Sequence, residues 1–230
     1  MARQLPLDLP PLESLARDDL IVSHSNAVAA GAIDAWPHWQ HNVLLIVGPE
    51  GSGKTHLARA WADLADASML AIGRSGEMTD RDGFRLVIDD IDRTTIPDAE
   101  LFGPINAARL GQGFVLATSR LAPEAMANRL ADLRSRLAAA ARVELDPPDD
   151  ELFEGILAKH FSDHQLFVDP GTLTYLAERI ERTGSAARSV VDALNRQALA
   201  DKSRITKPFV RKVLETNLHR TADPAGKRQT

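Results

Sequence analysis

The sequence predicts an α/β protein in which a three-layer parallel sheet, with helices on both faces, is followed by a small all-α domain. Three observations support this fold class. A phosphate-binding motif at 48–55 follows a short apolar run and precedes a helical pattern. Further apolar runs then alternate with helical patterns up to residue 145, as in sheets built from parallel crossovers. A linker with two prolines at 146–150 precedes four amphipathic helices.

The phosphate-binding motif is Gly-Pro-Glu-Gly-Ser-Gly-Lys-Thr, which fits the pattern G-x-x-x-x-G-K-[ST]. Its glycines allow the backbone to aim successive N–H groups at phosphate oxygens, while Lys54 reaches the outer phosphates and the Thr55 hydroxyl ligates Mg²⁺. The apolar run 42–47 and the helical spacing over 54–67 supply the required strand, loop and helix. We therefore predict binding of ATP or ADP by Gly48, Pro49, Gly51, Ser52, Gly53, Lys54, Thr55 and His56.

Composition narrows the classes of protein that fit. The 230 residues are 44% apolar, enough for one α/β domain and a smaller one. Cysteine is absent, which excludes disulfides and thiolate metal sites. The net charge of −5 argues against broad electrostatic capture of DNA, so we expect DNA contact to be indirect or local. No apolar run approaches membrane-spanning length, and we expect a cytoplasmic protein.

The first eleven residues are predicted to form an extended arm, because prolines interrupt any helix there. Gln4 is followed by Leu5, Leu7 and Leu9, which alternate along one edge of an extended peptide. Such an edge suits an apolar groove on a partner, and a tail without a partner is the alternative.

Between this arm and the phosphate loop we predict loop followed by helix. Ser25-Asn26 is a candidate N-cap for a helix over 27–36. The apolar residues Leu20, Ile21 and Val22 just before it are candidates to line an adenine pocket.

Acidic residues follow the second apolar run after the phosphate loop. After a predicted strand at 68–72, the run 84–88 leads into Asp89 and Asp90. Parallel strands deliver the residues after their carboxyl ends to the crevice where ligands bind, so we expect Asp89 to face the Mg²⁺ held by Thr55. Asp90 either positions an attacking water or is a solvated turn carboxylate.

A helix over 96–110 and two further strands complete the predicted sheet. The strand at 113–118 ends at Thr118-Ser119, whose hydroxyls either sense a γ-phosphate through water or cap the next helix. The last strand is predicted at 142–145.

The helices of the second domain are predicted from start signals at Asp150, Asp169-Pro170, Ser185 and Thr206. His160 and His164 have the i, i+4 spacing of zinc ligands, but the sequence offers no third ligand and we do not predict a zinc site. The predicted organisation is an arm at 1–11, an α/β base at 12–146, a helical lid at 147–218 and a disordered tail at 219–230.

Together these motifs resemble AAA+ proteins of the DnaA/Hda family, over nearly the whole chain. The family's phosphate loop corresponds to Gly48–Thr55, its Mg²⁺-site acids to Asp89 and Asp90, and its first sensor to Thr118-Ser119. Arg120 follows where the initiator DnaA often has an acid, which leaves Ser119 and Arg120 as alternatives for that sensor.

Two arginine motifs extend the resemblance. The family's arginine-finger box resembles Leu-Arg-Ser-Arg-Leu at 133–137, which places the finger on Arg136. The second sensor, in a lid helix that ends Ala-Leu-Asn-Arg, corresponds to Arg188.

The resemblance implies a negative regulator of replication initiation that has at most weak ATPase activity of its own. Such a protein holds ADP, is tethered to the DNA polymerase sliding clamp through Gln4, Leu5, Leu7 and Leu9, and offers Arg136 to ATP bound on DnaA. It would be associated with the replisome or nucleoid, contacting DNA through the clamp. A monomer and a nucleotide-dependent homodimer are alternatives. Because the sequence ends soon after 218, we do not expect the initiator's DNA-binding domain.

The main alternative is a self-sufficient AAA+ ATPase, either a loader or a DnaA-like initiator paralogue. It would hydrolyse its own ATP with its own Asp89 and Asp90, and with Arg136 supplied by a neighbouring copy. A small-molecule kinase is disfavoured by the helical lid that carries Arg188.

Overall fold

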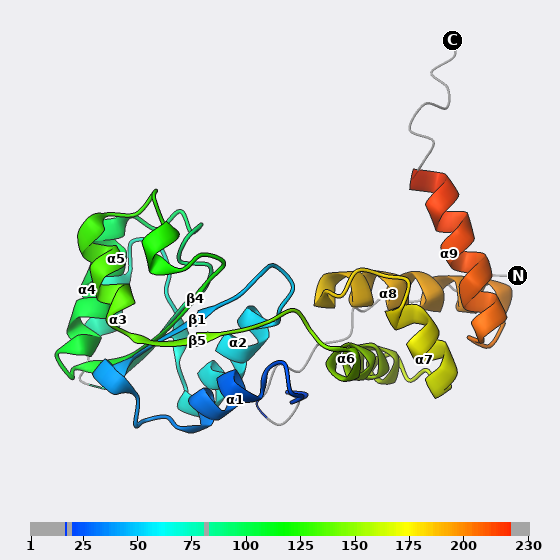
Figure 1. The fold of residues 1–230 in the computed structure, drawn as a ribbon, viewed down its shortest axis with the longest axis horizontal. Coiled ribbons are helices and arrows are strands. Elements are labelled where there is room, and N and C mark those ends of the chain that lie inside the picture. Colours follow the sequence, from blue (N-terminus) through cyan, green and yellow to red (C-terminus); the bar gives the residue numbers. More distant parts are fainter. Residues whose placement is uncertain (1–16, 18–19, 81–82, 222–230) are drawn as a thin grey trace, which may run out of the picture. The chain divides into compact units, whose positions relative to one another are not determined.

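The computed structural model describes Arg17, residues 20–80 and residues 83–221. These residues form two compact units (Figure 1). The α/β unit contains the described residues up to Phe153, together with Arg182–Ser185, and the helical unit contains Glu154–Glu181 and the described residues from Ala186 onward. The division therefore falls inside a helix, a few residues beyond the predicted linker.

The α/β unit alternates strands and helices along the chain. Its elements are α1 (Ala27–Asp34), a 3-10 turn (Gln40–Asn42), β1 (Val43–Val47), α2 (Lys54–Ala65), β2 (Ser68–Met69), α3 (Ser75–Thr79), β3 (Phe84–Ile88), α4 (Asp98–Arg109), β4 (Gly113–Ser119), a 3-10 turn (Pro123–Ala125), α5 (Ala131–Ala138) and β5 (Ala141–Glu144). The helical elements that follow are α6 (Asp150–Asp163), α7 (Pro170–Ala177), α8 (Gly184–Asp201) and α9 (Lys207–Thr221).

The strands form one five-stranded sheet in the order β2-β3-β4-β1-β5, and each pairing is parallel. Strand β1 is apolar at every position and buried throughout, because it has neighbours on both sides and helices over both faces. The predicted α/β class with a parallel sheet is confirmed. One strand is shorter than predicted: β2 ends at Met69, and the chain turns at Gly73, where φ is +76°.

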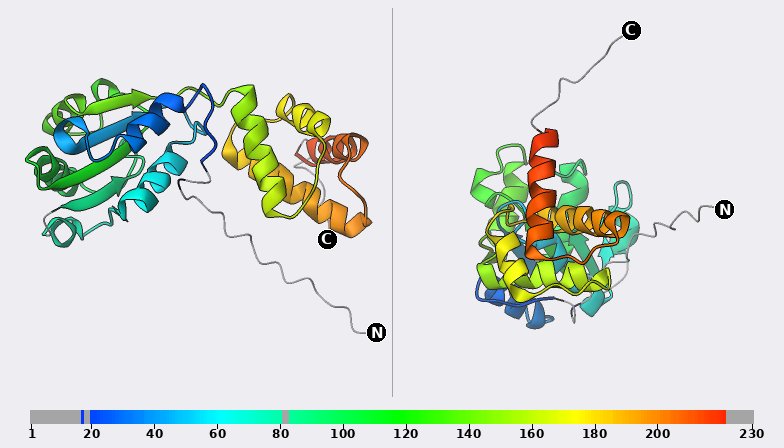
Figure 2. Two further views of the ribbon diagram at one scale, coloured as in Figure 1. Left: turned by 90° about the horizontal axis from the view of Figure 1, so that it is seen from below. Right: turned by 90° about the vertical axis from the view of Figure 1, so that its right-hand side faces the viewer.

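Two apolar cores cover the two faces of this sheet, and Figure 2 shows helices on both sides of the strands. Along β1, Val43, Leu45 and Val47 point into one core, and Leu44 and Ile46 into the other. The first core includes residues of α4 and α5, namely Leu101, Ile105, Leu133 and Leu137. The second includes residues of α1 and α2, namely Ala29, Ile33, Leu57, Ala58 and Trp61.

The helical unit buries the apolar stripes that predicted its helices, including Leu157, Phe161, Leu176, Val191, Leu194 and Val210. The Asp169 side chain accepts from Thr172 N at the start of α7, as its position before Pro170 predicts. At the start of α6 the capping carboxylate is Asp149, which accepts from Leu152 N at 2.8 Å, rather than the predicted Asp150.

In the described parts of the chain, every helix is either too short or too polar to cross a lipid bilayer.

Candidate functional site

Three neighbouring strands end close together and bring the phosphate loop, Asp89, Asp90 and Ser119 to one edge of the sheet. In the parallel register Val47 lies opposite Ser119, and Ile88 lies opposite Ala117. The residues that follow β1 and β3 therefore flank the end of β4. This arrangement follows from the strand order, in which β4 separates β1 from β3.

The loop between β1 and α2 has the backbone geometry that its glycines allow. Gly51 and Gly53 have φ angles of +76° and +92°, which side chains rarely permit. A Cβ atom added to Gly48 would lie 2.8 Å from the carbonyl oxygen of Leu145, and one added to Gly51 would lie 2.3 Å from Cγ2 of Thr183. A Cβ is thus excluded at Gly48 and Gly51 by close neighbours, and the chain then enters α2 directly at Lys54.

Lys54 is buried within this loop, with 6% of its surface exposed. Its ammonium donates to the carbonyl oxygens of Gly48 at 2.8 Å and Pro49 at 2.6 Å. Burial lowers the pKa of Lys54, and nearby Arg120 lowers it further, whereas Asp90, Asp92 and Asp89 act in the opposite direction. The loop therefore holds a desolvated positive charge at the helix N-terminus, the setting in which phosphate oxygens are bound.

Thr55 and Asp89, the two predicted Mg²⁺ ligands, lie in direct contact. The Thr55 hydroxyl is 3.2 and 3.0 Å from the two carboxylate oxygens of Asp89. Thr118, which is fully buried, donates from Oγ1 to Asp89 Oδ1 at 2.5 Å and accepts from Asp90 N at 2.8 Å. The end of β4 thereby fixes the orientation of the Asp89 carboxylate.

These oxygens fit a divalent cation that takes its other ligands from phosphate and water. Mg²⁺ is commonly held by one or two protein oxygens together with substrate phosphates. Among the described residues, no group of three or more His, Asp or Glu side chains could hold a metal ion alone. Thr55 and Asp89 would then supply the protein ligands, and the bound ion would neutralise phosphate charge.

Asp90 and Ser119 also lie at this edge of the sheet. Asp90 adopts a left-handed backbone with φ of +49°, and its carbonyl oxygen accepts from Arg93 N and Thr94 N at 2.8 Å each. Ser119 is fully buried, and its hydroxyl donates to Leu121 O and accepts from Leu121 N. The Ser119 hydroxyl thus closes a local turn, and its assignment to the nucleotide site gains no support from this geometry.

The candidate adenine segment is tied to the start of α6. The carbonyl oxygen of Ile21 accepts from Asn26 Nδ2 at 2.8 Å, while the Val22 side chain is 46% exposed. Next to them, the Ser23 hydroxyl donates to Asp149 Oδ2 at 2.9 Å, and Ser25 N donates to the same oxygen at 3.0 Å. Leu20 and Ala141 both pack against the core over α1 and α2.

Asp149 holds this arrangement in its ionised form. The hydrogen bond from Leu152 N is the largest of the interactions that lower the pKa of Asp149, and the hydrogen bonds from Ser23 and Ser25 add to it. One carboxylate therefore caps α6 and fixes the chain beside Leu20, Ile21 and Val22.

The two predicted arginines lie on different units. Arg136, on α5, is half-buried, with its guanidinium carbon 4.2 Å from the centre of the Phe102 ring and its Nε 3.4 Å from Asn106 Oδ1. Both partners belong to α4. Arg188 belongs to α8 in the helical unit. The predicted clamp-binding residues Gln4, Leu5, Leu7 and Leu9 lie outside the described residues.

One member of the histidine pair, His164, contacts two side chains of the helical unit. His164 Nε2 lies 2.9 Å from Asp192 Oδ1, and its Nδ1 lies 3.1 Å from Asn195 Nδ2. Both ring nitrogens of His164 therefore contact side chains of the helical unit.

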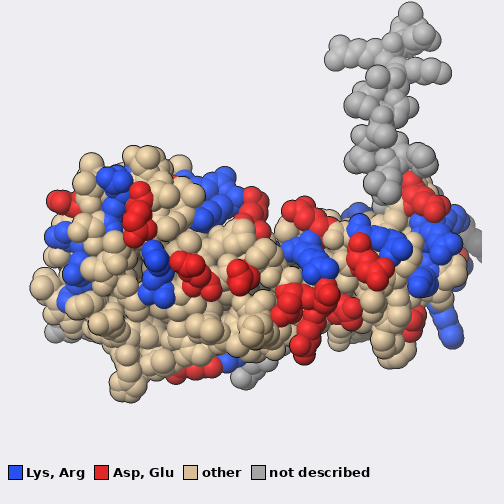
Figure 3. Space-filling model, viewed as in Figure 1, with Lys and Arg blue, Asp and Glu red and all other residues tan. Residues whose placement is uncertain are grey.

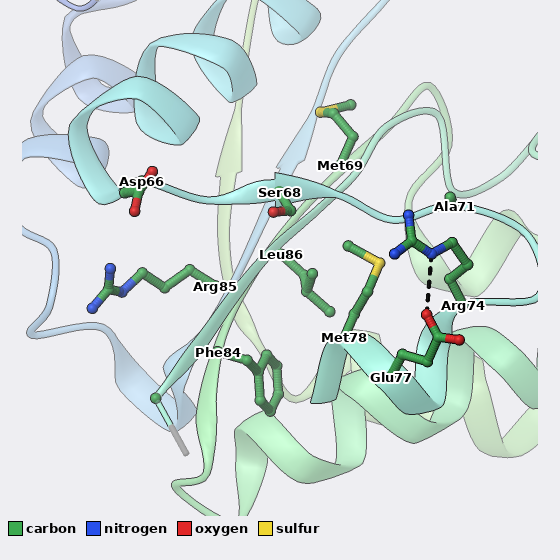
Figure 4. Close-up of a pocket in the computed structure, with 11 residues that line it drawn as sticks. Asp66, Ser68, Met69, Ala71, Arg74, Glu77, Met78, Phe84, Arg85 and Leu86 are labelled. Carbon is green, nitrogen blue, oxygen red and sulfur yellow. Dashed lines mark hydrogen bonds and ion pairs between the residues drawn. The ribbon is translucent and has the colours of Figure 1, made fainter. Parts of the chain in front are cut away.

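A separate hollow of about 460 Å³ lies at the β2 edge of the sheet (Figure 4). Its lining includes Met69, Met78 and Phe84, with an ion pair between Arg74 and Glu77 drawn at its side. None of the predicted site residues lines this hollow. The phosphate loop, rather than this hollow, is therefore the candidate site.

Charged side chains of both signs are interspersed over the described surface seen in Figure 3. This distribution matches the modest net charge of −5. The face in view offers no electrostatic reason to expect duplex DNA as a direct ligand.

Comparisons with known proteins found similar sequences over most of the chain. The family model described as "Hda, lid domain" matches residues 150–214. The chromosomal replication initiator protein DnaA of Lactobacillus delbrueckii subsp. bulgaricus is 28% identical over 240 residues, which cover 92% of this chain and 53% of that protein. These matches support assignment of the chain to the DnaA/Hda family of AAA+ proteins. It spans about half the length of the curated DnaA relatives that it matches.

Solved structures of DnaA share the fold. Domain III of Thermotoga maritima DnaA superposes with a TM-score of 0.73 at 20% identity, covering 90% of this chain and 98% of that one. A DnaA structure bound to AMPPCP and single-stranded DNA superposes with a TM-score of 0.65 at 17% identity, covering 82% and 68%. The DnaA/Hda fold therefore extends over both units.

Several contacts at this site were not predicted from the sequence. Thr118 orients Asp89, Thr183 lies against Gly51, and Asp149 caps α6 beside the adenine segment. The contact of Thr118 with Asp89 could have been suspected from the position of Thr118 at the end of a predicted strand. For Thr183 the sequence carries no signal, because its contact with Gly51 joins segments far apart in the chain.

Proposed function

We propose that this DnaA/Hda-family chain is a nucleotide-binding regulator that supplies Arg136 to ATP bound on the initiator DnaA. One observation carries the proposal: the described contacts that hold Arg136 come from Phe102 and Asn106 of α4 and not from the chain's own phosphate loop. A guanidinium placed in this way is suited to a neighbouring protein's site. There it would stabilise charge on the transferred phosphoryl group, an effect worth about 10³–10⁵ in rate for known fingers.

The chain's own site would hold ADP or ATP with Mg²⁺. Support comes from the glycine-dependent loop, the buried Lys54 ammonium and the contact between Thr55 and Asp89. The related DnaA structure that contains AMPPCP also supports this assignment. We propose ADP as the resident nucleotide, so that Lys54 and Thr55 act in binding and the chain's own turnover is weak.

Tethering to the sliding clamp is the part of the proposal that rests on the N-terminal arm. Gln4 followed by Leu5, Leu7 and Leu9 supplies one amide and three apolar side chains for a groove on the clamp. The clamp would confine the regulator to the replisome and provide its contact with DNA. The consequence would be conversion of ATP-bound DnaA to its ADP form after replication has begun.

A self-sufficient ATPase is the second candidate, and the arrangement around Asp89 favours it. Asp90 follows the carboxylate that contacts Thr55, and its backbone is fixed by Thr118. A water-positioning carboxylate at this place would allow hydrolysis of ATP bound on the same chain. In that case Arg136 would act on a second copy.

A hydrolysis assay with ATP-loaded DnaA separates these functions. The purified chain, clamp and DNA are added together and then omitted one at a time, and phosphate release is measured. We expect rapid hydrolysis only when all are present, and slow hydrolysis by the chain alone. Robust turnover of ATP by the chain without DnaA would instead establish the self-sufficient ATPase.

A further inference from the structure

Arg129 lies just before α5 and is almost wholly enclosed by the protein. Its side chain is 8% exposed, and that of its ion-pair partner, Asp98, is 15% exposed. Nη1 of Arg129 donates to Oδ1 of Asp98 at 2.7 Å. Removing one member of so enclosed a pair is costly, because the charge of the other stays buried. The pair is therefore a fixed part of the fold rather than an exchangeable surface contact.

Other N–H groups of this guanidinium bond to the loop that follows β3. Nε donates to the carbonyl oxygen of Ile91 at 2.9 Å, and Nη2 donates to that of Thr94 at 2.6 Å. Nη1 also reaches the carbonyl oxygen of Ile96 at 3.5 Å. One side chain thus satisfies backbone acceptors along the segment that leads from Ile91 to the start of α4.

This loop begins directly after Asp89, a proposed ligand of Mg²⁺. The Thr118 hydroxyl contacts Asp89 and accepts from Asp90 N, while the carbonyl oxygen of Thr118 accepts from Ile91 N at 2.8 Å. The first residues of the loop are therefore fixed to the end of β4. Ligation of the Asp89 carboxylate by an ion would stabilise the loop at the point where it leaves β3.

The same ion pair also fixes the start of α5. Asp98 is the first residue of α4, and its Oδ2 accepts from Leu130 N at 2.6 Å. Leu130 is the N-cap residue of α5. Close by, Asn128 Nδ2 donates to the carbonyl oxygen of Asp92 at 2.8 Å. The loop after β3 and the residues before α5 thus share their contacts, so an opening of one segment breaks the hydrogen bonds of the other.

Helix α5 carries Arg136, which contacts Phe102 and Asn106 of α4. Asp98 lies about one turn before Phe102 on that same helix. Helices α4 and α5 are therefore held together by Asp98 and Arg129 at their starts, and by the contacts of Arg136 further along. When the starts open, only those later contacts keep Arg136 in place.

We propose that Arg129 is a positioning residue that makes the placement of Arg136 depend on occupancy of the chain's own nucleotide site. With Mg²⁺ and nucleotide bound, the loop after Asp89 would open less often, and the start of α5, which shares Arg129, would open less often with it. Coupling of this kind requires no displacement of the backbone. The inference rests on the proposed function and adds how the chain's own site would regulate its finger.

Amide hydrogen exchange, measured by mass spectrometry on the full chain, tests this link without DnaA. We expect ADP with Mg²⁺ to slow exchange at residues 130–134 of the unmodified chain by about 10-fold. Arg129→Gln should bind ADP within about 3-fold of the unmodified affinity, yet ADP should slow that segment by no more than about 2-fold. Arg129→Lys keeps the charge but lacks the planar fork that bonds several carbonyls, so it should not restore the response.

Arg142→Gln is the matched control, because it removes an arginine of β5 whose ion pairs are with Glu124 and Glu144. It should keep the full slowing at residues 130–134. An equal loss of slowing in Arg142→Gln would show general destabilisation and overturn the inference. Full slowing in Arg129→Gln would overturn it as well.

Asp98→Asn tests the link if Arg129→Gln does not fold. This variant weakens the ion pair but leaves the bonds from Arg129 to the carbonyls of Ile91 and Thr94. It should lose most of the slowing at residues 130–134 while still binding ADP. Full slowing in Asp98→Asn would exclude the ion pair as the link.

The DnaA hydrolysis assay connects this link to the finger. Arg129→Gln should lower maximal stimulation by about 10-fold, while the chain concentration that gives half-maximal stimulation changes by no more than about 2-fold. A merely destabilised variant, corrected for its fraction of ADP-binding chain, would keep the maximal value. Unchanged maximal stimulation in Arg129→Gln would show that Arg136 does not depend on Arg129.

The results also distinguish this inference from the proposed function. If the unmodified chain binds ADP but exchange at residues 130–134 is not slowed, the link is wrong and the nucleotide site stands. If the unmodified chain binds no nucleotide, the proposed site is wrong and the link is wrong with it. If exchange is slowed as expected but DnaA is not stimulated, the proposed action of Arg136 on DnaA is wrong and the link between the site and α5 stands.

Discussion

The guanidinium of Arg136 stacks on the ring of Phe102, 4.2 Å from the ring centre to its central carbon. Helix α4 thus provides the residues that contact Arg136 of α5. An arginine over an aromatic face keeps its charge and its hydrogen-bond donors while losing conformational freedom. Under the proposed function, this pairing would reduce the conformational freedom that Arg136 loses on contact with a partner.

Replacing this arginine tests its role in the partner's site. Arg136→Ala should leave nucleotide affinity unchanged and reduce stimulation of DnaA hydrolysis by a factor of about 10³ or more. Phosphate release in the complete assay is the measurement. Full stimulation by the variant would remove Arg136 from this role, and Arg134 would be the next arginine to replace.

Phe102 should affect the same step more weakly. Phe102→Leu keeps apolar volume but removes the aromatic face, so stimulation should fall by about 2- to 5-fold, as expected for a cation–π contact worth about 0.5–1 kcal/mol. Phe102→Tyr retains the face and should restore stimulation. Equal loss in both variants would show that ring packing in α4, rather than contact with Arg136, is responsible.

The shifted pKa of Lys54 predicts an alkaline limit to nucleotide binding. Burial lowers this pKa below 10.5, so the free protein loses the ammonium charge at a lower pH than ordinary lysine does. Because phosphate binding favours the charged form, affinity should fall as pH rises through the lowered pKa. Binding in that range should take up a proton, which calorimetry in buffers of different ionisation enthalpy detects.

Lys54→Ala and Lys54→Arg provide the controls for this prediction. The alanine variant should bind nucleotide much more weakly at every pH. The arginine variant remains charged, so any affinity it retains should be independent of pH over the same range. An unmodified chain whose affinity stays constant up to pH 10.5 would contradict the predicted role of Lys54.

Thr118 offers a test of the metal site that does not remove a proposed ligand. Thr118→Val has nearly the same shape but leaves Asp90 N without its buried acceptor, at a cost of about 1–3 kcal/mol in unfolding free energy. It also frees the Asp89 carboxylate, so Mg²⁺ should enhance nucleotide binding less. Denaturant unfolding and nucleotide titrations with and without Mg²⁺ measure the two effects.

Ser119→Ala is the control for Thr118. Its hydroxyl bonds only within the local turn that ends at Leu121, so the variant should keep the full response to Mg²⁺. A loss of that response equal to the loss in Thr118→Val would show that the end of β4 acts as a whole rather than through Asp89.

Asp149 should contribute stability that depends on pH. Its hydrogen bonds lower its pKa in the folded state below 3.8. The stabilisation is therefore complete above the unfolded pKa and is lost as pH falls through the folded one. Asp149→Ala should lower the unfolding free energy by about 1–2 kcal/mol at neutral pH, and the difference should shrink in acid.

A second helix cap, Asp169, serves as a control that separates effects on folding stability from effects on nucleotide binding. Asp169 caps α7 and also has a lowered pKa, mainly through its hydrogen bond with the Thr172 side chain. Asp169→Ala should destabilise the helical unit without changing nucleotide affinity. Asp149→Ala should weaken adenine nucleotides as well, because it releases Ser23 and Ser25 beside the adenine segment. Unchanged nucleotide affinity in Asp149→Ala would show that this segment does not contact the adenine ring.

The arm prediction is tested by capture on the sliding clamp. Replacing Gln4 and Leu5 with alanine should abolish capture, because the amide and the first apolar contact are lost together. Asp8→Ala changes a residue between the leucines and should leave capture unchanged. If the double variant is captured as well as the unmodified chain, the arm has no part in binding the clamp.

The fold class was predictable because the strands carry strong local signals. Val43–Val47 is wholly apolar, and the phosphate loop and a helical pattern follow it at once. The short helix α3 has no apolar stripe of its own, and β2 has only two residues. Such elements form through contacts with neighbours, so the local pattern does not predict their extent.

The site was predictable as a set of residues and less so as a set of contacts. Lys54, Thr55 and Asp89 are identified by motif and strand position, and the structure brings Thr55 and Asp89 together. Their catalytic and metal roles remain predictions. The hydrogen bond from Thr118 to Asp89 depends on β4 lying beside β3. The apolar pattern of β4 indicates that the strand is buried but does not indicate which strand lies next to it.

The position of β1 between β4 and β5 has a consequence for biosynthesis. Both partners of β1 are translated after β2 and β3, and Gly48 N bonds to Ser119 O, the last residue of β4. A nascent chain that stops short of Gly113 therefore carries an apolar strand whose backbone groups have no native partner, a state prone to aggregation. The phosphate loop should acquire its shape only after β4 has left the ribosome. Until then, chaperones could bind the exposed apolar strand.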